Sequence, residues 1–342
     1  MIGRFALAVM VLALISWLAV TELQRRWQQP LLLPQEGASL TVASGDSLGA
    51  VVERLHQRGL LPYPRLVTWY GRWSGQDQRI KRGEYLLPPG TTPGSLLSLL
   101  ESGRVVQYQV TLPEGITLVQ ALGILADEAA LQNILSGPDD QRLVELVAPQ
   151  SETEGLFFPD SYYYARGDSD WQVLQRAHRS MLVQLQEEWE SRAPELPYET
   201  PYDALIMASI IEKETGLPEE REQIAGVFVR RLQKGMRLQT DPTIIYGLGE
   251  TFDGNLRRKH LKDASNPYKS YRHGGLPPTP IALPGRAAIH AALHPAEGES
   301  LYFVARGDGG HVFSATLAEH ERAVRKYQLQ RRHDYRSSPE SN

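Results

Sequence analysis

The longest apolar run of the chain lies at its start, where residues 5–20 read FALAVMVLALISWLAV. The run holds no charged residue and is polar only at Ser16. It is slightly shorter than the roughly 20 apolar residues of a spanning helix, and the apolar positions before it lengthen it. Because residues 19–21 make a poor signal-peptide cleavage site, the pattern predicts an uncleaved membrane anchor over residues 5–22 rather than a signal peptide.

Positive charges on both sides of this run leave its orientation open. Arg4 and the terminal amine flank one end, whereas Arg25 and Arg26 flank the other, so the positive-inside rule is close to a tie. Residues 23–38 contain two prolines and mixed polarity, and they read as a linker. Nearly the whole chain follows the anchor, and the orientation therefore decides the compartment in which the protein works.

A short strand, a glycine and an amphipathic helix recur three times after the linker. The glycines are Gly45, Gly90 and Gly115. A hydroxyl residue two positions after each glycine is well placed to cap the following helix. The three hydroxyl residues are Ser47, Thr92 and Thr117. Because the three copies are unevenly spaced along the chain, they do not form a solenoid. The first two copies, with the helical stretch between them, predict a compact α/β module over residues 39–103.

This small module resembles the LysM-like fold of peptidoglycan-associated proteins. A generic α/β spacer is an equally open interpretation, because shared architecture does not determine function. The aromatic residues Trp69, Tyr70 and Trp73 suit stacking on sugars, although core packing explains most such residues.

Composition narrows the function classes. The 342 residues are enough for about two domains. With 36 Lys and Arg against 40 Asp and Glu, the net charge is −4, so we expect no nucleic-acid partner. The hydrophobic fraction of 42% is sufficient for a folded core. Cysteine is absent, which excludes disulfides, Cys-ligated zinc, iron–sulfur clusters and a Cys nucleophile.

A helix is predicted to begin at Thr200, because Thr200 can cap, a proline follows, and Asp203 completes a capping box. It is expected to run to Thr215 and to stop at Gly216. A helical period of about 100° per residue places a set of small and branched residues and one acid on a single face. The residues of this face are Leu205, Ala208, Ser209 and Glu212.

Glu212 ends this apolar stripe, whereas Glu214 lies about 200° from it around the helix axis. Apolar surroundings raise the pKa of a carboxyl, and a carboxylic acid near neutral pH can protonate a leaving oxygen. Glu212 is therefore a candidate general acid. The alternative is a solvated helix-end residue that pairs with Lys213 or Arg221.

Polar segments downstream suit a carbohydrate substrate. After a second amphipathic helix over residues 219–234, three hydrogen-bonding residues, Gln239, Thr240 and Asp241, precede a proline. Asp241 either orients Glu212 or caps the next turn. The Pro- and Gly-rich segment 266–285 predicts a long irregular loop, which is usually functional in a compact domain. Its amide and aromatic side chains are Asn266, Tyr268 and Tyr271.

Several separate segments together resemble the endolytic murein transglycosylases, also called the YceG-like family. They occur in the order of the family and cover about residues 40–330. The segments are 154–162 (EGLFFPDSY), 210–215 (IIEKET), 237–243 (RLQTDPT), 275–278 (GLPP), 284–285 (PG), 301–305 (LYFVA) and 311–313 (HVF).

The predicted fold class is α+β. It comprises an N-terminal transmembrane helix, the LysM-like module, a larger catalytic domain over residues 104–335 and a flexible tail over residues 336–342. The resemblance implies a bacterial inner-membrane protein with residues 1–4 in the cytoplasm and the catalytic body in the periplasm. It also implies endolytic cleavage of nascent peptidoglycan at the MurNAc–GlcNAc β-1,4 bond, and a glycan synthase of the penicillin-binding-protein type as a partner.

The catalytic glutamate of the family falls on Glu212. This residue would make both proton transfers, while the C6 hydroxyl of MurNAc closes a 1,6-anhydro ring in place of a second carboxylate. The substrate-binding positions are Glu154, Gln239, Thr240, Asp241, Asn266 and Tyr271, with Tyr268 added from the loop.

Two other functions stay open at this point. One is a non-catalytic scaffold that holds glycan near a synthase, and the other is a glycan hydrolase that uses Glu212 with Asp241. No cofactor and no metal are expected. His290 and His294 have the spacing of a zinc-binding helix, but no Glu follows the first His and no third ligand is evident.

Overall fold

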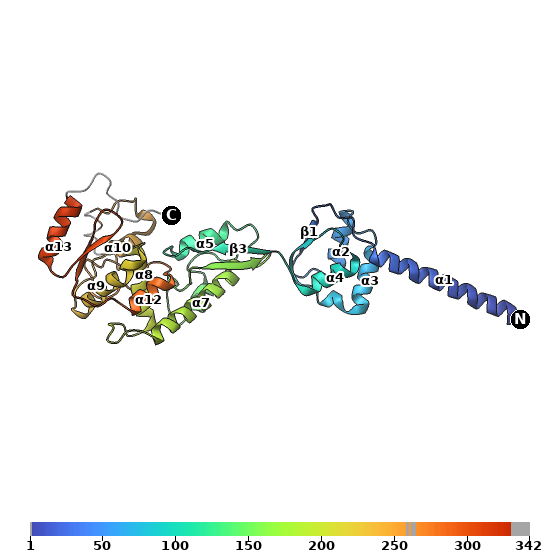
Figure 1. Cartoon of the computed structure of the whole chain (residues 1–342), viewed down its shortest axis with the longest axis horizontal. Coiled ribbons are helices and arrows are strands. Elements are labelled where there is room, and N and C mark those ends of the chain that lie inside the picture. The colour runs from blue at the N-terminus through green and yellow to red at the C-terminus, as the bar shows by residue number, and fades with distance from the viewer. Residues whose placement is uncertain (1, 258–259, 261–264, 330–342) are drawn as a thin grey trace. The chain divides into compact units, whose positions relative to one another are not determined.

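The computed structural model describes residues 2–257, 260 and 265–329, without the side chains of residues 2, 3, 5 and 8. The predicted tail, residues 336–342, and the end of the predicted catalytic domain lie outside the described residues. The chain forms two compact units (Figure 1). Unit 1 comprises residues 1–109, 129–132 and 163–168, and unit 2 comprises residues 110–128, 133–162 and 169–342.

The fold is α+β, as predicted. It is mostly helical, and the described residues contain three two-stranded sheets. In unit 1, the antiparallel pair β1–β2 places Leu40 opposite Tyr85, and both side chains are buried in the core. The elements of this unit are α1 (Ile2–Gln28), β1 (Ala38–Val42), α2 (Leu48–Gln57), α3 (Pro64–Ser74), the 3-10 turn Gln76–Gln78, β2 (Gly83–Leu87) and α4 (Pro93–Ser102).

The three predicted helix caps are confirmed. Ser47 accepts a hydrogen bond from the backbone N–H of Ala50, and Thr92 and Thr117 each form a capping box. The glycine two positions before each cap has a positive φ, of 83°, 88° and 74° in chain order. A side chain would be strained in this conformation, which explains why glycine precedes each helix.

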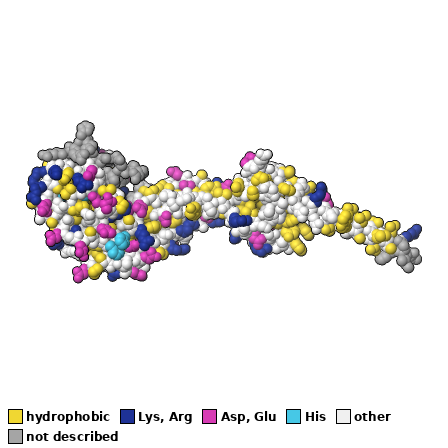
Figure 2. Space-filling view, in the orientation of Figure 1, with side chains coloured by type: hydrophobic (Ala, Val, Ile, Leu, Met, Phe, Trp, Pro, Cys, Tyr) yellow, Lys and Arg dark blue, Asp and Glu magenta, His cyan; other side chains and the backbone are white. Residues whose placement is uncertain are grey.

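Helix α1 extends into the predicted linker and ends at Gln28. Trp27 stabilises this last turn because its ring packs 4.2 Å from that of Tyr70, and Glu22 forms ion pairs with Arg25 and Arg26. Hydrophobic side chains are exposed along α1 (Figure 2). Trp69 is also exposed.

None of the described helices is long and apolar enough to cross a membrane. The side chains at positions 5 and 8 of the predicted anchor, residues 5–22, lie outside the described set.

Unit 2 is built around helix α8, which is buried on all sides between residues 204 and 211. It packs against α7, α9, α10 and α12. The division between the units falls within the paired strands β3 and β4. The elements are β3 (Gln107–Thr111), α5 (Leu118–Ala126), α6 (Gln141–Val147), β4 (Ser161–Ala165), α7 (Asp170–Glu190), α8 (Pro201–Glu214), the 3-10 turn Pro218–Glu220, α9 (Arg221–Gln233), α10 (Asp241–Leu248), the 3-10 turn Gly249–Thr251, α12 (Arg286–Leu293), β5 (Tyr302–Ala305), β6 (His311–Ser314), α13 (Leu317–Val324) and the π-helical turn Arg325–Leu329.

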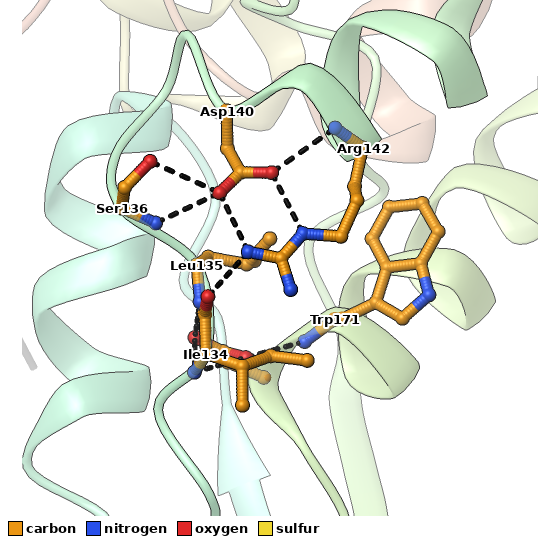
Figure 3. Close-up of polar contacts among 7 residues, drawn as sticks. Ile134, Leu135, Ser136, Asp140, Arg142 and Trp171 are labelled. Carbon is orange, nitrogen blue, oxygen red and sulfur yellow. Dashed lines mark hydrogen bonds and ion pairs between the residues drawn. The ribbon is translucent and has the colours of Figure 1, made fainter.

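Two acidic residues at helix starts anchor the segment before α6 (Figure 3). Asp140 accepts hydrogen bonds from the backbone N–H and the hydroxyl of Ser136, both at 3.0 Å, and from the guanidinium of Arg142. Asp170 accepts from the backbone N–H of Ile134 at 3.1 Å. The Arg142 guanidinium holds the pKa of Asp140 well below its usual range, so this carboxylate stays charged.

The predicted irregular loop is confirmed, since residues 265–285 contain no helix or strand. Ser209, fully buried on α8, connects this loop to the core. Its hydroxyl accepts a hydrogen bond from the backbone N–H of Ile281 at 3.0 Å and donates one to the carbonyl oxygen of Ile206 at 2.7 Å. The helix that holds this loop, α8, is therefore the same helix that ends at Glu214.

Substitution Ser209→Ala is expected to lower the free energy of unfolding by about 1–3 kcal/mol, because it leaves the buried Ile281 N–H without an acceptor. Chemical denaturation measures this change. The control Ser191→Ala removes an exposed hydroxyl that donates to a helix carbonyl, and we expect a change within about 0.5 kcal/mol. An equally small effect of Ser209→Ala would contradict the anchoring role.

Candidate active site

Unit 2 contains a pocket of about 630 Å³, in the size range typical of ligand sites. The end of α8, residues 238–241 up to the start of α10, and the loop residue Tyr271 contribute one part of its lining. The rest comes from α9, β5, β6, α13 and the π-helical turn after α13. The polar lining residues are Glu214, Arg231, Gln239, Thr240, Asp241, Tyr271, Tyr302, His311, His320 and Gln328.

Glu214 is the acidic residue of this pocket that best suits proton transfer. It is the last residue of α8, and its carboxyl accepts a hydrogen bond from the Thr240 hydroxyl. Burial raises the pKa of Glu214 to about 7, with a further contribution from the charge of Asp241 and an opposing one from the Thr240 hydrogen bond. A substantial fraction of this half-buried carboxyl is therefore protonated at neutral pH.

The residues around Glu214 are held in place by the loop. Ser270 accepts a hydrogen bond from the Thr240 N–H at 2.9 Å, and the Tyr271 hydroxyl donates to the Asp241 carboxylate at 2.9 Å. Gln239 has a φ of 53°, a left-handed conformation that is uncommon for residues other than glycine and often found at functional sites. The structure thus brings together four predicted substrate-binding residues. These are Gln239, Thr240, Asp241 and Tyr271.

One interpretation of the sequence was that Asp241 caps the next turn, but Asp241 does not cap α10. The N-cap position is occupied by Thr240, and Asp241 is the first residue of the helix. Its carboxylate instead accepts the hydrogen bond of Tyr271. For the other interpretation, that Asp241 orients Glu212, the described residues show no hydrogen bond or ion pair between the two side chains.

Glu212 does not line this pocket, and its catalytic role stays a prediction. Its carboxylate accepts a hydrogen bond from the Gly285 N–H at 3.0 Å and pairs with Arg221 at 3.5 Å, and its side chain is only 6% exposed. Burial raises the pKa of Glu212, while the Gly285 hydrogen bond opposes that shift. Because Glu212 and Glu214 point in different directions around α8, only Glu214 reaches the pocket.

Glu154, another predicted substrate-binding residue, does not line this pocket. It is 8% exposed and accepts hydrogen bonds from the Leu118 N–H at 3.0 Å, at the start of α5, and from the Tyr246 hydroxyl at 3.3 Å. Burial raises its pKa to about 7. Glu154 therefore connects α5 to α10, whose first residue, Asp241, lines the pocket.

Asn266 and Tyr268 likewise support the site from outside the pocket. Asn266 is buried, donates to the Ile244 carbonyl oxygen at 3.3 Å and accepts from the Tyr268 N–H at 2.9 Å. The Tyr268 hydroxyl shares a hydrogen bond with Thr279 at 2.8 Å. The Tyr268 ring also packs against that of Tyr246 of α10, with centroids 4.8 Å apart. Both residues therefore hold the loop against α10, and neither lines the pocket.

The sequence predictions did not include Glu214 or four other polar residues that line this pocket. One local signal pointed to Glu214, because a carboxyl at a helix C-terminus opposes the helix dipole and is unfavourable unless something else requires it. The remaining residues lie far apart along the chain, and although two of them fall in family-like segments, no local pattern assigned any of them to a pocket. They are Arg231, Tyr302, His311 and His320.

The histidine pair does have a third potential ligand, contrary to expectation. Ligand atoms of Glu188, His290 and His294 lie within 4.8 Å of one another, because α7 packs against α12. Both carboxylate oxygens of Glu188 are engaged, one by Arg286 at 3.0 Å and the other by His290 Nδ1 at 2.8 Å. The two imidazole rings stack, with centroids 4.1 Å apart. This cluster ties α7 to α12.

A recessed carboxyl with a pKa near 7, beside hydroxyl and amide groups, is typical of an enzyme that transfers protons to and from a polar substrate. The chain belongs to the YceG-like family, whose family model matches residues 40–326.

Relatives from three bacteria agree with this membership. An endolytic murein transglycosylase of Bacillus subtilis (strain 168) is 30% identical over 309 residues, which cover 84% of each chain. An endolytic murein transglycosylase of Streptococcus pneumoniae is 24% identical, and the match covers 84% of this chain and 57% of that relative. The crystal structure of a YceG-like protein from Listeria monocytogenes has a TM-score of 0.55 and 27% identity, over 84% of this chain and 99% of that one.

Proposed function

We propose that this protein is a lytic transglycosylase that cleaves the MurNAc–GlcNAc β-1,4 bond within peptidoglycan strands. The products would be strands with 1,6-anhydroMurNAc ends, and cleavage would terminate strand elongation. The observation that carries the proposal is the carboxyl of Glu214, recessed in the pocket with a pKa of about 7. The B. subtilis relative is named for this class of reaction.

A single carboxyl can perform both proton transfers of this reaction. Protonated Glu214 donates its proton to the glycosidic oxygen, the bond from that oxygen to C1 of MurNAc breaks, and an oxocarbenium-like state develops at C1. The Glu214 carboxylate then takes the proton of the C6 hydroxyl, whose oxygen bonds to C1. The ring closes, the glutamate is protonated again, and no water is consumed. The intramolecular hydroxyl acts at a high effective concentration.

The neighbours of Glu214 have distinct roles in this mechanism. The Thr240 hydroxyl orients the carboxyl through its hydrogen bond. Asp241, held by the Tyr271 hydroxyl, supplies a negative charge that stabilises the positive charge at C1 in the transition state. The side chain of Gln239 provides an amide for the hydroxyl or N-acetyl groups of the sugar. We therefore assign the catalytic role predicted for Glu212 to Glu214.

Product analysis in isotopically labelled water tests the reaction type. Purified protein acting on uncrosslinked glycan strands is expected to release fragments whose new ends are 1,6-anhydroMurNAc and contain no ¹⁸O from the solvent. Mass spectrometry of the fragments measures both properties. Reducing ends that carry ¹⁸O would identify a hydrolase, and intact strands would favour the non-catalytic scaffold.

The cellular setting forms a separate part of the proposal. Residues 5–22 anchor the chain in the bacterial inner membrane, with residues 1–4 in the cytoplasm and the remainder in the periplasm. Support comes from the uncharged run at 5–20 and from exposed apolar side chains along α1, which are unfavourable in water. The order β1–α2–α3–β2 supports the LysM-like interpretation. A glycan synthase of the penicillin-binding-protein type is the proposed partner.

A further inference from the structure

The pocket extends beyond the groups that the proposed reaction uses. Its lining also includes Arg231 of α9, Tyr302 of β5 and His320 of α13. The imidazole of His320 stacks on the Tyr302 ring, with centroids 5.1 Å apart. Burial and the charge of Arg231 lower the pKa of His320. His320 is therefore neutral at pH 7, and Arg231 is the cation among these three residues.

Arg231 is a buried cation held by neutral groups. Its Nε donates to the Leu301 carbonyl oxygen at 2.8 Å, its Nη1 donates to the Leu238 carbonyl oxygen at 2.5 Å, and its guanidinium lies over the Tyr302 ring at 5.2 Å. In the part of the chain that the structure describes, no ion pair includes Arg231. A buried charge without a counter-charge is unfavourable, and an anionic ligand would relieve this.

The proposed substrate offers such an anion. The sugar rings of peptidoglycan carry neutral hydroxyl and N-acetyl groups, whereas the lactyl ether of MurNAc ends in a carboxyl. In stripped glycan this carboxylate is free, and in intact glycan it is joined to a peptide stem that carries carboxylates of its own. Guanidinium groups recognise carboxylates through strong charge-assisted hydrogen bonds.

We propose that Arg231 binds a carboxylate attached to the lactyl ether of MurNAc and so contributes to substrate specificity. This inference rests on the proposed function. It predicts that the pocket distinguishes glycans by the charge of their lactyl substituent. The guanidinium selects the substrate by this group, while Glu214 acts on the glycosidic bond.

Binding of defined glycans to the full chain carrying Glu214→Gln tests the inference without cleavage of the probe. Three tetrasaccharides serve as probes, with a free lactyl carboxylate, a lactyl amide, or a peptide stem. We expect at least one carboxylate-bearing probe to bind about tenfold more tightly than the amide, and adding Arg231→Gln to remove that preference. The probe that shows the preference identifies the source of the carboxylate.

Arg230→Gln is the matched control. Arg230 is the preceding residue of α9 and also donates to two carbonyl oxygens, those of Ser300 at 2.9 Å and Ala296 at 2.8 Å, but it does not line the pocket. It is expected to leave the carboxylate preference unchanged, and Arg231→Lys is expected to retain part of it. Equal affinity for all three probes, or no binding of any, would overturn the inference. The inference would also be overturned if Arg231→Gln lowered the affinity for all three probes equally, or if Arg230→Gln removed the carboxylate preference as well.

The wild-type chain separates this inference from the proposed function. Cleavage of charged and amidated strands with the same kcat/KM would refute the role of Arg231 and leave the transglycosylase proposal intact. An Arg231-dependent preference in binding, without anhydro products from any strand, would refute the proposed function alone.

Discussion

Substitution Glu214→Gln is expected to reduce strand cleavage by about 10²–10⁴-fold, the usual contribution of a general acid. A glutamine has nearly the same shape and can still accept the Thr240 hydrogen bond, but it can neither donate a proton to the glycosidic oxygen nor take one from the C6 hydroxyl. The rate of appearance of anhydro-ended fragments measures the loss. Thermal unfolding of the same sample shows whether the fold is retained.

Glu212→Gln is the matched control, because it makes the same chemical change two residues earlier on α8. Its amide oxygen can still accept the Gly285 N–H, and only the attraction to Arg221 is lost. This variant is expected to keep most of the activity. A folded but inactive Glu212→Gln protein, together with an active Glu214→Gln protein, would return the catalytic role to Glu212.

Substitution Glu154→Gln is expected to increase the free energy of unfolding at pH 8, by on the order of 3 kcal/mol at most. The pKa of Glu154 is about 7 in the folded protein, compared with an ordinary value of 4.5. Between these two values the folded state binds more protons than the unfolded state, so this carboxyl lowers stability as the pH rises from about 4.5 to 7. The neutral amide removes that loss and can still accept the Leu118 N–H.

The comparison is made by chemical denaturation at pH 4 and pH 8. At pH 4 both side chains are neutral, and the free energies of unfolding of variant and wild type are expected to differ little. At pH 8 the free energy of unfolding of the variant is expected to be the larger. Glu152→Gln changes an exposed side chain, and its free energy of unfolding is expected to stay near that of wild type at both pH values. A Glu154→Gln protein that is less stable than wild type at pH 8 would show that the carboxylate form is the one the fold stabilises.

The sequence by itself determined the local structure of this protein. The caps at Ser47, Thr92, Thr117 and Thr200 formed as predicted, because each cap bonds a backbone N–H a few residues away. The irregular loop over residues 266–285 also followed from its prolines and glycines. The family could be recognised from short segments in a fixed order, which requires no knowledge of how they meet in space.

The tertiary structure alone decided which residues form the site. Helical periodicity placed Glu212 and Glu214 on different faces, but it did not say which face meets a pocket. Segments from residue 214 to residue 328 converge on that pocket, and their side chains have no shared local pattern. The raised pKa of Glu214 and the burial of Arg231 both depend on this convergence, because desolvation comes from neighbours distant in the chain.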